Sequence, residues 1–342
     1  MKILDYQNNL GESCNYKVIS NIFKYYGLDI PEEFIYLLFK TTFIKDNKIH
    51  IHSISENTFN SIGGKINICK FNSINEFQKQ IELFIEKNEI LLINTNPQYL
   101  SFFQINYNLH IDNSHCCVIY GICEDGIYVA DNYVPTYPPK IFNGKVDLIE
   151  IYNAVQNSKD YDKIFTFDIQ NIKDINLIDI YIEHYNMLAE KIIKDNLKRK
   201  YKEEQNNIFF KNVMKEEKRF DDIGYDFVKK VVEETRIEWM SLDGPVLSRG
   251  YLANIFNKLA SMTANKKYKL YAETLFYFKK CWDSLSRGYI KFAITQNVDV
   301  FKKCSFNYMQ LLIDEIDFFN KSKIIEEKYG CATGKYNKKN NS

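Results

Sequence analysis

Five of the six prolines of the 342-residue chain lie before residue 168, and this uneven distribution most constrains what the chain can fold into. Up to about residue 168, short β-rich runs are separated by Gly, Pro, Asn and Asp. Beyond that point Pro245 is the only proline, and apolar residues recur at helical intervals. We therefore expect an α+β domain over residues 1–168, a helical domain over residues 169–330 and a polar, mobile tail over residues 331–342.

The first half carries clear helix signals. Residues 14–26 have an apolar stripe at helical spacing, and Ser13 is a preferred N-cap residue. Gly27 is a preferred residue just past a helix C-terminus. The sequence therefore predicts a helix that begins at Cys14, and a weaker helix over residues 75–87.

The same half carries strand signals. A buried strand is predicted over residues 89–95, followed by a run from Tyr99 to Tyr107. Residues 116–122 and 127–131 are rich in β-forming residues, and the Asp-Gly pair that ends at Gly126 predicts a turn between them. A hairpin is thus the clearest β signal in the chain.

The second half is predicted to be a helical bundle. Its expected helices span residues 176–204, 208–219, 222–241, 248–263, 266–283, 285–295 and 297–327.

Charge and composition narrow the class of protein. Lys plus Arg (45) nearly balances Asp plus Glu (44), so the chain lacks the basic excess of a general nucleic-acid binder. No segment reaches the roughly 18 apolar residues that a membrane span needs, and the N-terminus lacks a secretory signal. The adjacent Cys116 and Cys117 suit a reduced compartment better than a disulfide framework. We expect a cytoplasmic protein.

Three residues suggest nucleophilic catalysis, which requires a thiolate, a base and a group that orients the base. Cys14 lies at a predicted helix start, where backbone N–H groups and the helix dipole stabilise a thiolate. His115 opens the first strand of the hairpin, and Asp131 closes the return strand. This chain order, Cys then His then Asp, is that of papain-like enzymes.

The hairpin register tests whether His115 and Asp131 can meet. If Cys123 and Ile127 flank a three-residue loop, Asp131 pairs with Ile119, on the His115 face but about 13 Å along the strand. A bulge or strong twist would be needed to close that gap. The sequence therefore favours a Cys14–His115 dyad over a complete triad.

A metal site is not expected beside His115. Adjacent strand residues point to opposite faces, so His115, Cys116 and Cys117 cannot all ligate one ion. His50 and His52 share a strand face, but two ligands do not complete a site.

Three segments resemble the butirosin biosynthesis protein H family. Residues 14–33, CNYKVISNIFKYYGLDIPEE, resemble its opening helix and the turn that follows. The hairpin from His115 resembles its His strand and "VADP"-like strand, with Asn132 where Pro is more usual. Residues 243–252, DGPVLSRGYL, resemble the Gly…Arg…Tyr stretch of its helical C-terminal domain.

This resemblance implies a papain- or C39-like cysteine-protease fold recruited for acyl transfer, as in the amide-forming enzyme of closthioamide-type assembly. An acyl or peptidyl group would pass from the phosphopantetheine thioester of a carrier protein to Cys14, and then to a small amine. His115 would exchange protons and Asp131 would orient His115. No metal or cofactor is implied, apart from the phosphopantetheine that arrives on the carrier protein.

An oxyanion hole would combine the Cys14 backbone N–H with a side-chain donor. Asn8 has the papain-like spacing of six residues before Cys14, whereas Gln7 lies one residue farther away but has a longer amide side chain.

Two other functions and one partner surface stay open. A hydrolase of the same fold, such as a peptidase, amidase or thioesterase, would use Cys14 and His115 with water in place of the amine. A non-catalytic binding module would use neither. A basic helix is either a solvated face or a dock for an acidic carrier protein; its charged residues are Lys191, Lys194, Lys198, Arg199, Lys200 and Lys202.

Overall fold

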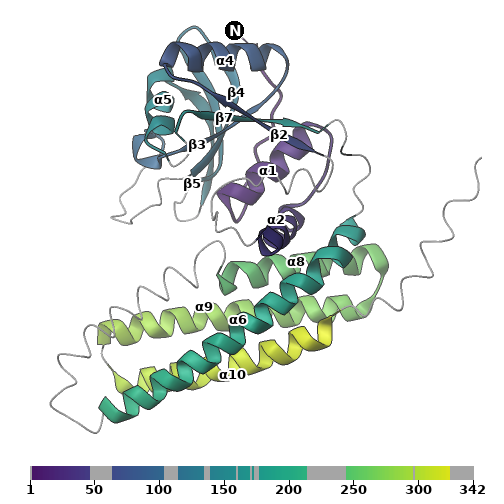
Figure 1. The fold of residues 1–342 in the computed structure, drawn as a ribbon, viewed down its shortest axis with the longest axis vertical. Helices are drawn as coiled ribbons and strands as arrows, with labels where there is room; N and C mark the ends of the chain where they lie inside the picture. Colours follow the sequence, from purple (N-terminus) through teal and green to yellow (C-terminus); the bar gives the residue numbers. More distant parts are fainter. Residues whose placement is uncertain are drawn as a thin grey trace, which may run out of the picture. The chain divides into compact units, whose positions relative to one another are not determined.

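The computed structural model describes residues 2–46, 64–103, 115–134, 139–158, 161–169, 172, 177–213, 244–295 and 297–323. The chain forms two compact units, Met1–Ile180 and Tyr181–Ser342. The first is α+β and the second is helical (Figure 1). Residues 104–107 of the run 99–107, the helix predicted at 222–241 and the tail 331–342 lie outside the described residues.

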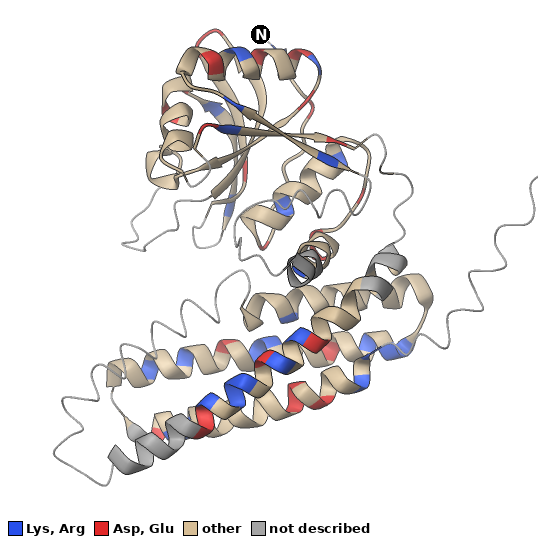
Figure 2. Ribbon diagram, in the orientation of Figure 1, with Lys and Arg blue, Asp and Glu red and all other residues tan. Residues whose placement is uncertain are grey.

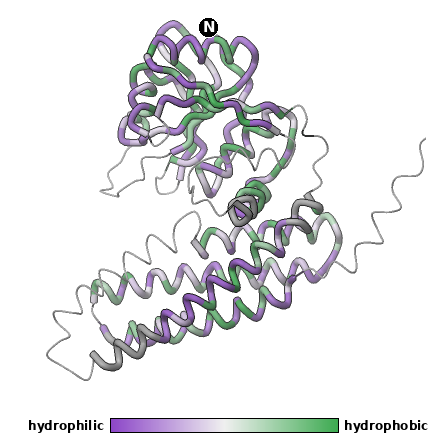
Figure 3. The backbone as a smooth tube through the Cα atoms, in the orientation of Figure 1, coloured by the Kyte–Doolittle hydropathy of each residue, from purple (hydrophilic) through white to green (hydrophobic). Residues whose placement is uncertain are grey.

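The N-terminal unit is built on one antiparallel sheet. Its strand order is β2-β7-β3-β4-β5-β6, and β1 pairs with β4 off this path. The strands are β1 (Lys2–Ile3), β2 (Lys65–Lys70), β3 (Leu91–Thr95), β4 (His115–Cys123), β5 (Gly126–Val134), β6 (Lys140–Val146) and β7 (Lys163–Asp168). The strands β3 and β4, at the centre, are buried almost throughout, and Figure 3 shows hydrophobic residues along these central strands.

Helices cover the sheet. The helix α1 (Cys14–Tyr25) packs against β4 and β5, and α2 (Glu32–Asp46) packs against α1. The helices α4 (Ile74–Glu86) and α5 (Leu148–Gln156) lie on the other side of the sheet (Figure 1). The site-bearing strands β4 and β5 therefore lie at the centre of a layered unit.

Local signals explain the helices that the sequence predicts. The Ser13 hydroxyl accepts hydrogen bonds from the backbone N–H of Asn15 and Tyr16, and this cap begins α1 at Cys14. Past its C-terminus, Gly27 has a φ of 89°, a conformation that favours glycine. The helix predicted at 75–87 is confirmed as α4.

The helical unit contains most of α6 (Leu177–Val213), together with α8 (Pro245–Thr263), α9 (Lys266–Thr295) and α10 (Val298–Ser322). The breaks predicted at residues 205–207 and at residue 284 are wrong, because α6 and α9 run through them. Polar residues such as Ser284 are weak helix breakers, and packing of a long helix overrides them. Within the described ranges, no helix combines the length and apolar character needed to cross a bilayer.

A buried ion pair joins the four helices that the structure describes in this unit. Glu315 is fully buried, and its carboxylate accepts hydrogen bonds from Arg249 Nε and Nη2, both at 2.7 Å. Trp282 Nε1 and Asn196 Nδ2 each donate to the same carboxylate at 2.8 Å. Burial alone would raise the pKa of Glu315, but the charge of Arg249 and these hydrogen bonds hold that pKa below its usual value.

Arg249→Met should lower the free energy of unfolding of the helical unit by about 3–5 kcal/mol, because it leaves Glu315 as an uncompensated buried charge. Urea denaturation followed by tryptophan fluorescence measures this, since both tryptophans, Trp239 and Trp282, lie in that unit. The matched control is Lys321→Met, which breaks the exposed pair with Asp317 and should leave the midpoint nearly unchanged. An equal loss in the free energy of unfolding for both substitutions would contradict a stabilising role of the buried Arg249–Glu315 pair.

Candidate active site

Cys14 is the first residue of α1, and its side chain is partly exposed. The Ser13 cap takes the next two backbone N–H groups, those of Asn15 and Tyr16. Among the described residues, the Cys14 backbone N–H has no hydrogen-bond partner. A free N–H at a helix N-terminus beside a thiol is a donor for a developing oxyanion.

The register of the hairpin differs from the expectation in two ways. The turn has two residues rather than three, because Cys123 pairs with Gly126. A bulge then shifts the register between Ile119 and Gly121, so that Ile119 pairs with Val129. The predicted pairing of Asp131 with Ile119 is therefore wrong, and continuing the observed register places Asp131 opposite Cys117.

The bulge decides which face Asp131 occupies. With the short turn alone, Asp131 would lie opposite Val118 and on the sheet face away from His115, since strand residues alternate. The extra residue, Tyr120, shifts the pairing by one further residue. As a result, the side chains of His115, Cys117 and Asp131 lie on the same face of the sheet.

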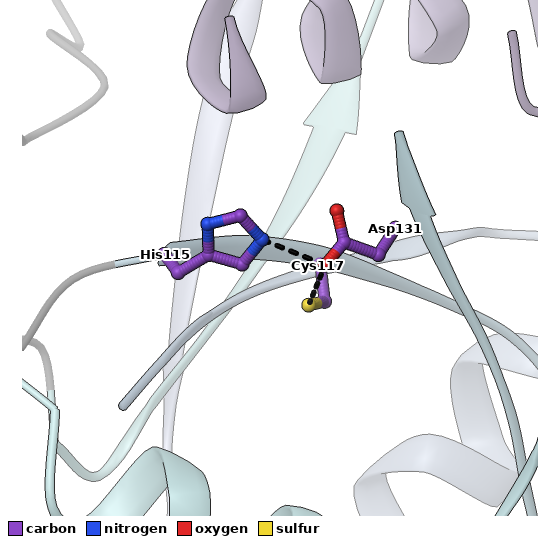
Figure 4. A group of neighbouring side chains, drawn as sticks. All are labelled: His115, Cys117 and Asp131. Atoms are coloured by element: carbon purple, nitrogen blue, oxygen red, sulfur yellow. Dashed lines mark hydrogen bonds and ion pairs between the residues drawn. The ribbon is translucent and has the colours of Figure 1, made fainter. Parts of the chain in front are cut away.

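His115 and Asp131 make the central contact of the site. His115 Nε2 lies 2.7 Å from Asp131 Oδ2, and both side chains are buried. Figure 4 shows the imidazole and the carboxylate pointing toward each other, with the Cys117 thiol beside them. The second carboxylate oxygen, Asp131 Oδ1, accepts a 2.8 Å hydrogen bond from the Tyr133 backbone N–H. The structure thus brings together two residues that the expected register holds apart.

The contact with Asp131 determines the charge and orientation of His115. Burial alone would lower the pKa of His115, but the charges of Asp131 and Cys14 and their hydrogen bonding hold that pKa well above its ordinary value. Because Nε2 faces Asp131, Nδ1 is the ring nitrogen left for Cys14. The Phe103 ring packs edge-on against the imidazole, with ring centroids 4.9 Å apart.

Asn8 braces the site and is not free to bind an oxyanion. Its amide nitrogen donates to the backbone oxygens of Asp131 and Phe142, at 2.8 and 3.1 Å, which uses both amide hydrogens. Its amide oxygen accepts a hydrogen bond from Asn21 Nδ2 at 3.3 Å. Gln7, the other residue considered for this role, is exposed.

Two further residues hold the start of α1, and the sequence does not predict either of them. Glu32 Oε1 accepts from the Ser13 backbone N–H at 2.9 Å, and Glu32 Oε2 accepts from the Glu12 backbone N–H at 3.3 Å. Asn132 Nδ2 donates to the Ser13 backbone oxygen at 3.0 Å. Both contacts join segments far apart in the sequence, so spacing carries no signal for them.

His115, Cys117 and Asp131 are also the described residues whose geometry comes nearest to a metal site, with ligand atoms within 4.8 Å of one another. Burial, followed by the charge of Asp131, raises the pKa of the Cys117 thiol well above its ordinary value. In the structure these three side chains form a hydrogen-bonded cluster, in which Asp131 Oδ2 contacts His115 Nε2 at 2.7 Å and the Cys117 thiol at 3.9 Å. Cys116 is buried too, with Sγ 3.0 Å from Asn94 Oδ1; His50, His52 and His110 lie outside the described residues.

Comparison with known families points to the same segment. Residues 13–132 match the family model described as butirosin biosynthesis protein H, N-terminal. The match begins at the cap of α1 and ends just after Asp131, so it includes Cys14, His115 and Asp131. No curated protein matches the chain. Over residues 13–132, the N-terminal unit is therefore similar to the N-terminal part of the butirosin biosynthesis protein H family.

Proposed function

We propose that this protein is a biosynthetic enzyme of the acyltransferase type, related to antibiotic assembly, and that Cys14 is its nucleophile. The observation that carries the proposal is the buried His115–Asp131 hydrogen bond beside a cysteine at a capped helix start, all within the family match. A helix that packs against a central antiparallel sheet also supports a papain- or C39-like fold for this unit.

In the first half-reaction, the Cys14 thiolate attacks the thioester carbonyl of an acyl or peptidyl carrier protein. The Cys14 backbone N–H stabilises the negative oxygen of the tetrahedral intermediate. Gln7 is the remaining side-chain candidate for a second donor. Collapse breaks the bond to the pantetheine sulfur, which takes the proton of the His115 imidazolium, and leaves acyl-Cys14 and a neutral His115.

In the second half-reaction, a small amine attacks acyl-Cys14. Neutral His115 takes a proton from the amine nitrogen, and the Cys14 thiolate leaves as the amide forms. This step restores the original ion pair of thiolate and imidazolium. Asp131 holds His115 in one orientation in both steps. The two half-reactions together require no metal ion and no nucleotide, because an amide is more stable than a thioester.

Incubation with an acyl N-acetylcysteamine thioester should add one acyl mass to the protein, and Cys14→Ala should abolish the adduct because it removes the nucleophile. Intact-mass spectrometry detects the adduct. Cys123→Ala removes another partly exposed thiol and serves as the matched control. An adduct that survives in the Cys14→Ala variant would refute the assignment. Addition of amines then separates amide formation from hydrolysis by product mass, which tests the hydrolase alternative.

A basic face on α6 supports a carrier protein as the acyl donor. Lys194, Lys198 and Lys202 recur every four residues and are exposed. Figure 2 shows the Lys and Arg positions along this helix in blue. Between them, Leu197 and Tyr201 are 50% and 65% exposed. Carrier proteins are acidic, and their association with such a face is steered by charge and weakened by salt.

Reversal of Lys194, Lys198 and Lys202 to Glu should lower kcat/KM for the carrier-bound donor by about tenfold or more, since steering becomes repulsion. Turnover of the small thioester should not change, because it does not need the face. A triple reversal of the exposed Lys280, Lys291 and Lys302, on α9 and α10, is the matched control. Equal losses in both triple variants, or none in the first, would exclude α6 as the dock.

A further inference from the structure

The peptide group that joins Ser13 to Cys14 is held from outside the helix. Its carbonyl oxygen accepts a 3.0 Å hydrogen bond from Asn132 Nδ2, which is shorter than the 3.3 Å intrahelical bond from the Lys17 N–H to the same oxygen. The preceding N–H, that of Ser13, donates to Glu32 at 2.9 Å. Ser13 and Asn132 are each 1% exposed. Water therefore does not compete for these bonds.

The bond from Asn132 has a consequence for the other end of the same peptide group. In a planar trans peptide the C=O and N–H bonds point in opposite directions. A donor that holds the Ser13 oxygen therefore also sets the direction of the Cys14 N–H. Among the described residues, that N–H has no hydrogen-bond partner.

We propose that Asn132 is a positioning residue that aims the Cys14 backbone N–H at the developing oxyanion; this inference rests on the proposed function. Asn132 directly follows Asp131 in β5. One strand thus orients both halves of the machinery, the imidazole through Asp131 and the oxyanion donor through Asn132. The register set by the bulge places both residues at once.

The remaining polar atom of Asn132 supports a role for its amide donor. Among the described residues, Asn132 Oδ1 is buried and has no hydrogen-bond partner. An unsatisfied buried acceptor costs stability. The hydrogen bond from the Asn132 nitrogen to the Ser13 oxygen is therefore what this side-chain amide contributes in the structure.

Two reactions of the Cys14 sulfur distinguish a positioning role of Asn132 from a general effect of this residue on the structure. Acylation by a thioester passes through a tetrahedral oxyanion and uses the Cys14 N–H. Alkylation by iodoacetamide displaces iodide at a saturated carbon and forms no oxyanion. Asn132→Ala should slow acylation by the N-acetylcysteamine thioester by about 10- to 100-fold, and its alkylation rate should stay close to that of the wild type. Asn132→Leu, which keeps the side-chain size and removes the donor, should behave likewise and serves if the alanine variant does not fold.

The matched control is Asn96→Ala. Asn96 is also a buried amide that donates to a backbone oxygen, that of Asn157 at 3.2 Å, and its loss should leave the ratio of the two rates unchanged. Equal slowing of both reactions in the Asn132 variants, or slowing of neither, would overturn the positioning role. A wild-type protein that alkylates at Cys14 but is never acylated would overturn the proposed function itself, so the two failures are distinguishable.

Discussion

The hydrogen bond between His115 and Asp131 is the interaction on which the site depends, and one extra residue in β4 makes it possible. Without the bulge, strand alternation would send the carboxylate to the wrong face of the sheet. The bulged residue, Tyr120, packs against the rings of Tyr6 and Tyr128, with centroids 5.9 and 6.1 Å away. At Gly121, where β1 pairs with β4, an added Cβ would lie 3.0 Å from the Lys2 backbone oxygen. Packing on both sides therefore keeps the irregular register.

Several segments of the N-terminal unit form hydrogen bonds to the start of α1. The Ser13 hydroxyl caps the helix from within, Glu32 holds it from α2, and Asn132 holds it from β5. Asn8 ties β5 to α1 through Asp131 and Asn21. These contacts leave Cys14 on a rigid element with its backbone N–H available, as preorganised catalysis by electrostatic stabilisation requires.

The elements that the sequence predicted well are those with local causes. The Ser13 cap, the apolar stripe and Gly27 determine the bounds of α1, and the Asp-Gly pair at residue 126 indicates the hairpin. The register was not predictable, because turn length and bulge depend on distant partners such as Tyr6 and β1. The sequence does not predict the strand β6, because Lys and Asn on its exposed face weaken the alternation of apolar and polar residues. The role of Asn132 depends on a contact 119 residues away in the chain, and no spacing rule encodes it.

In the proposed mechanism, His115 is an imidazolium held by Asp131 at neutral pH. The ¹⁵N chemical shifts of its ring nitrogens, followed over a pH titration of the wild type and of Asp131→Asn, test this claim directly. Because Asp131 raises the pKa of His115 and burial lowers it, both nitrogens of the wild-type ring should stay protonated well above pH 6.5. In Asp131→Asn the proton should be lost at lower pH. A wild-type ring that is already neutral at pH 7, or a titration that Asp131→Asn leaves in place, would contradict the account.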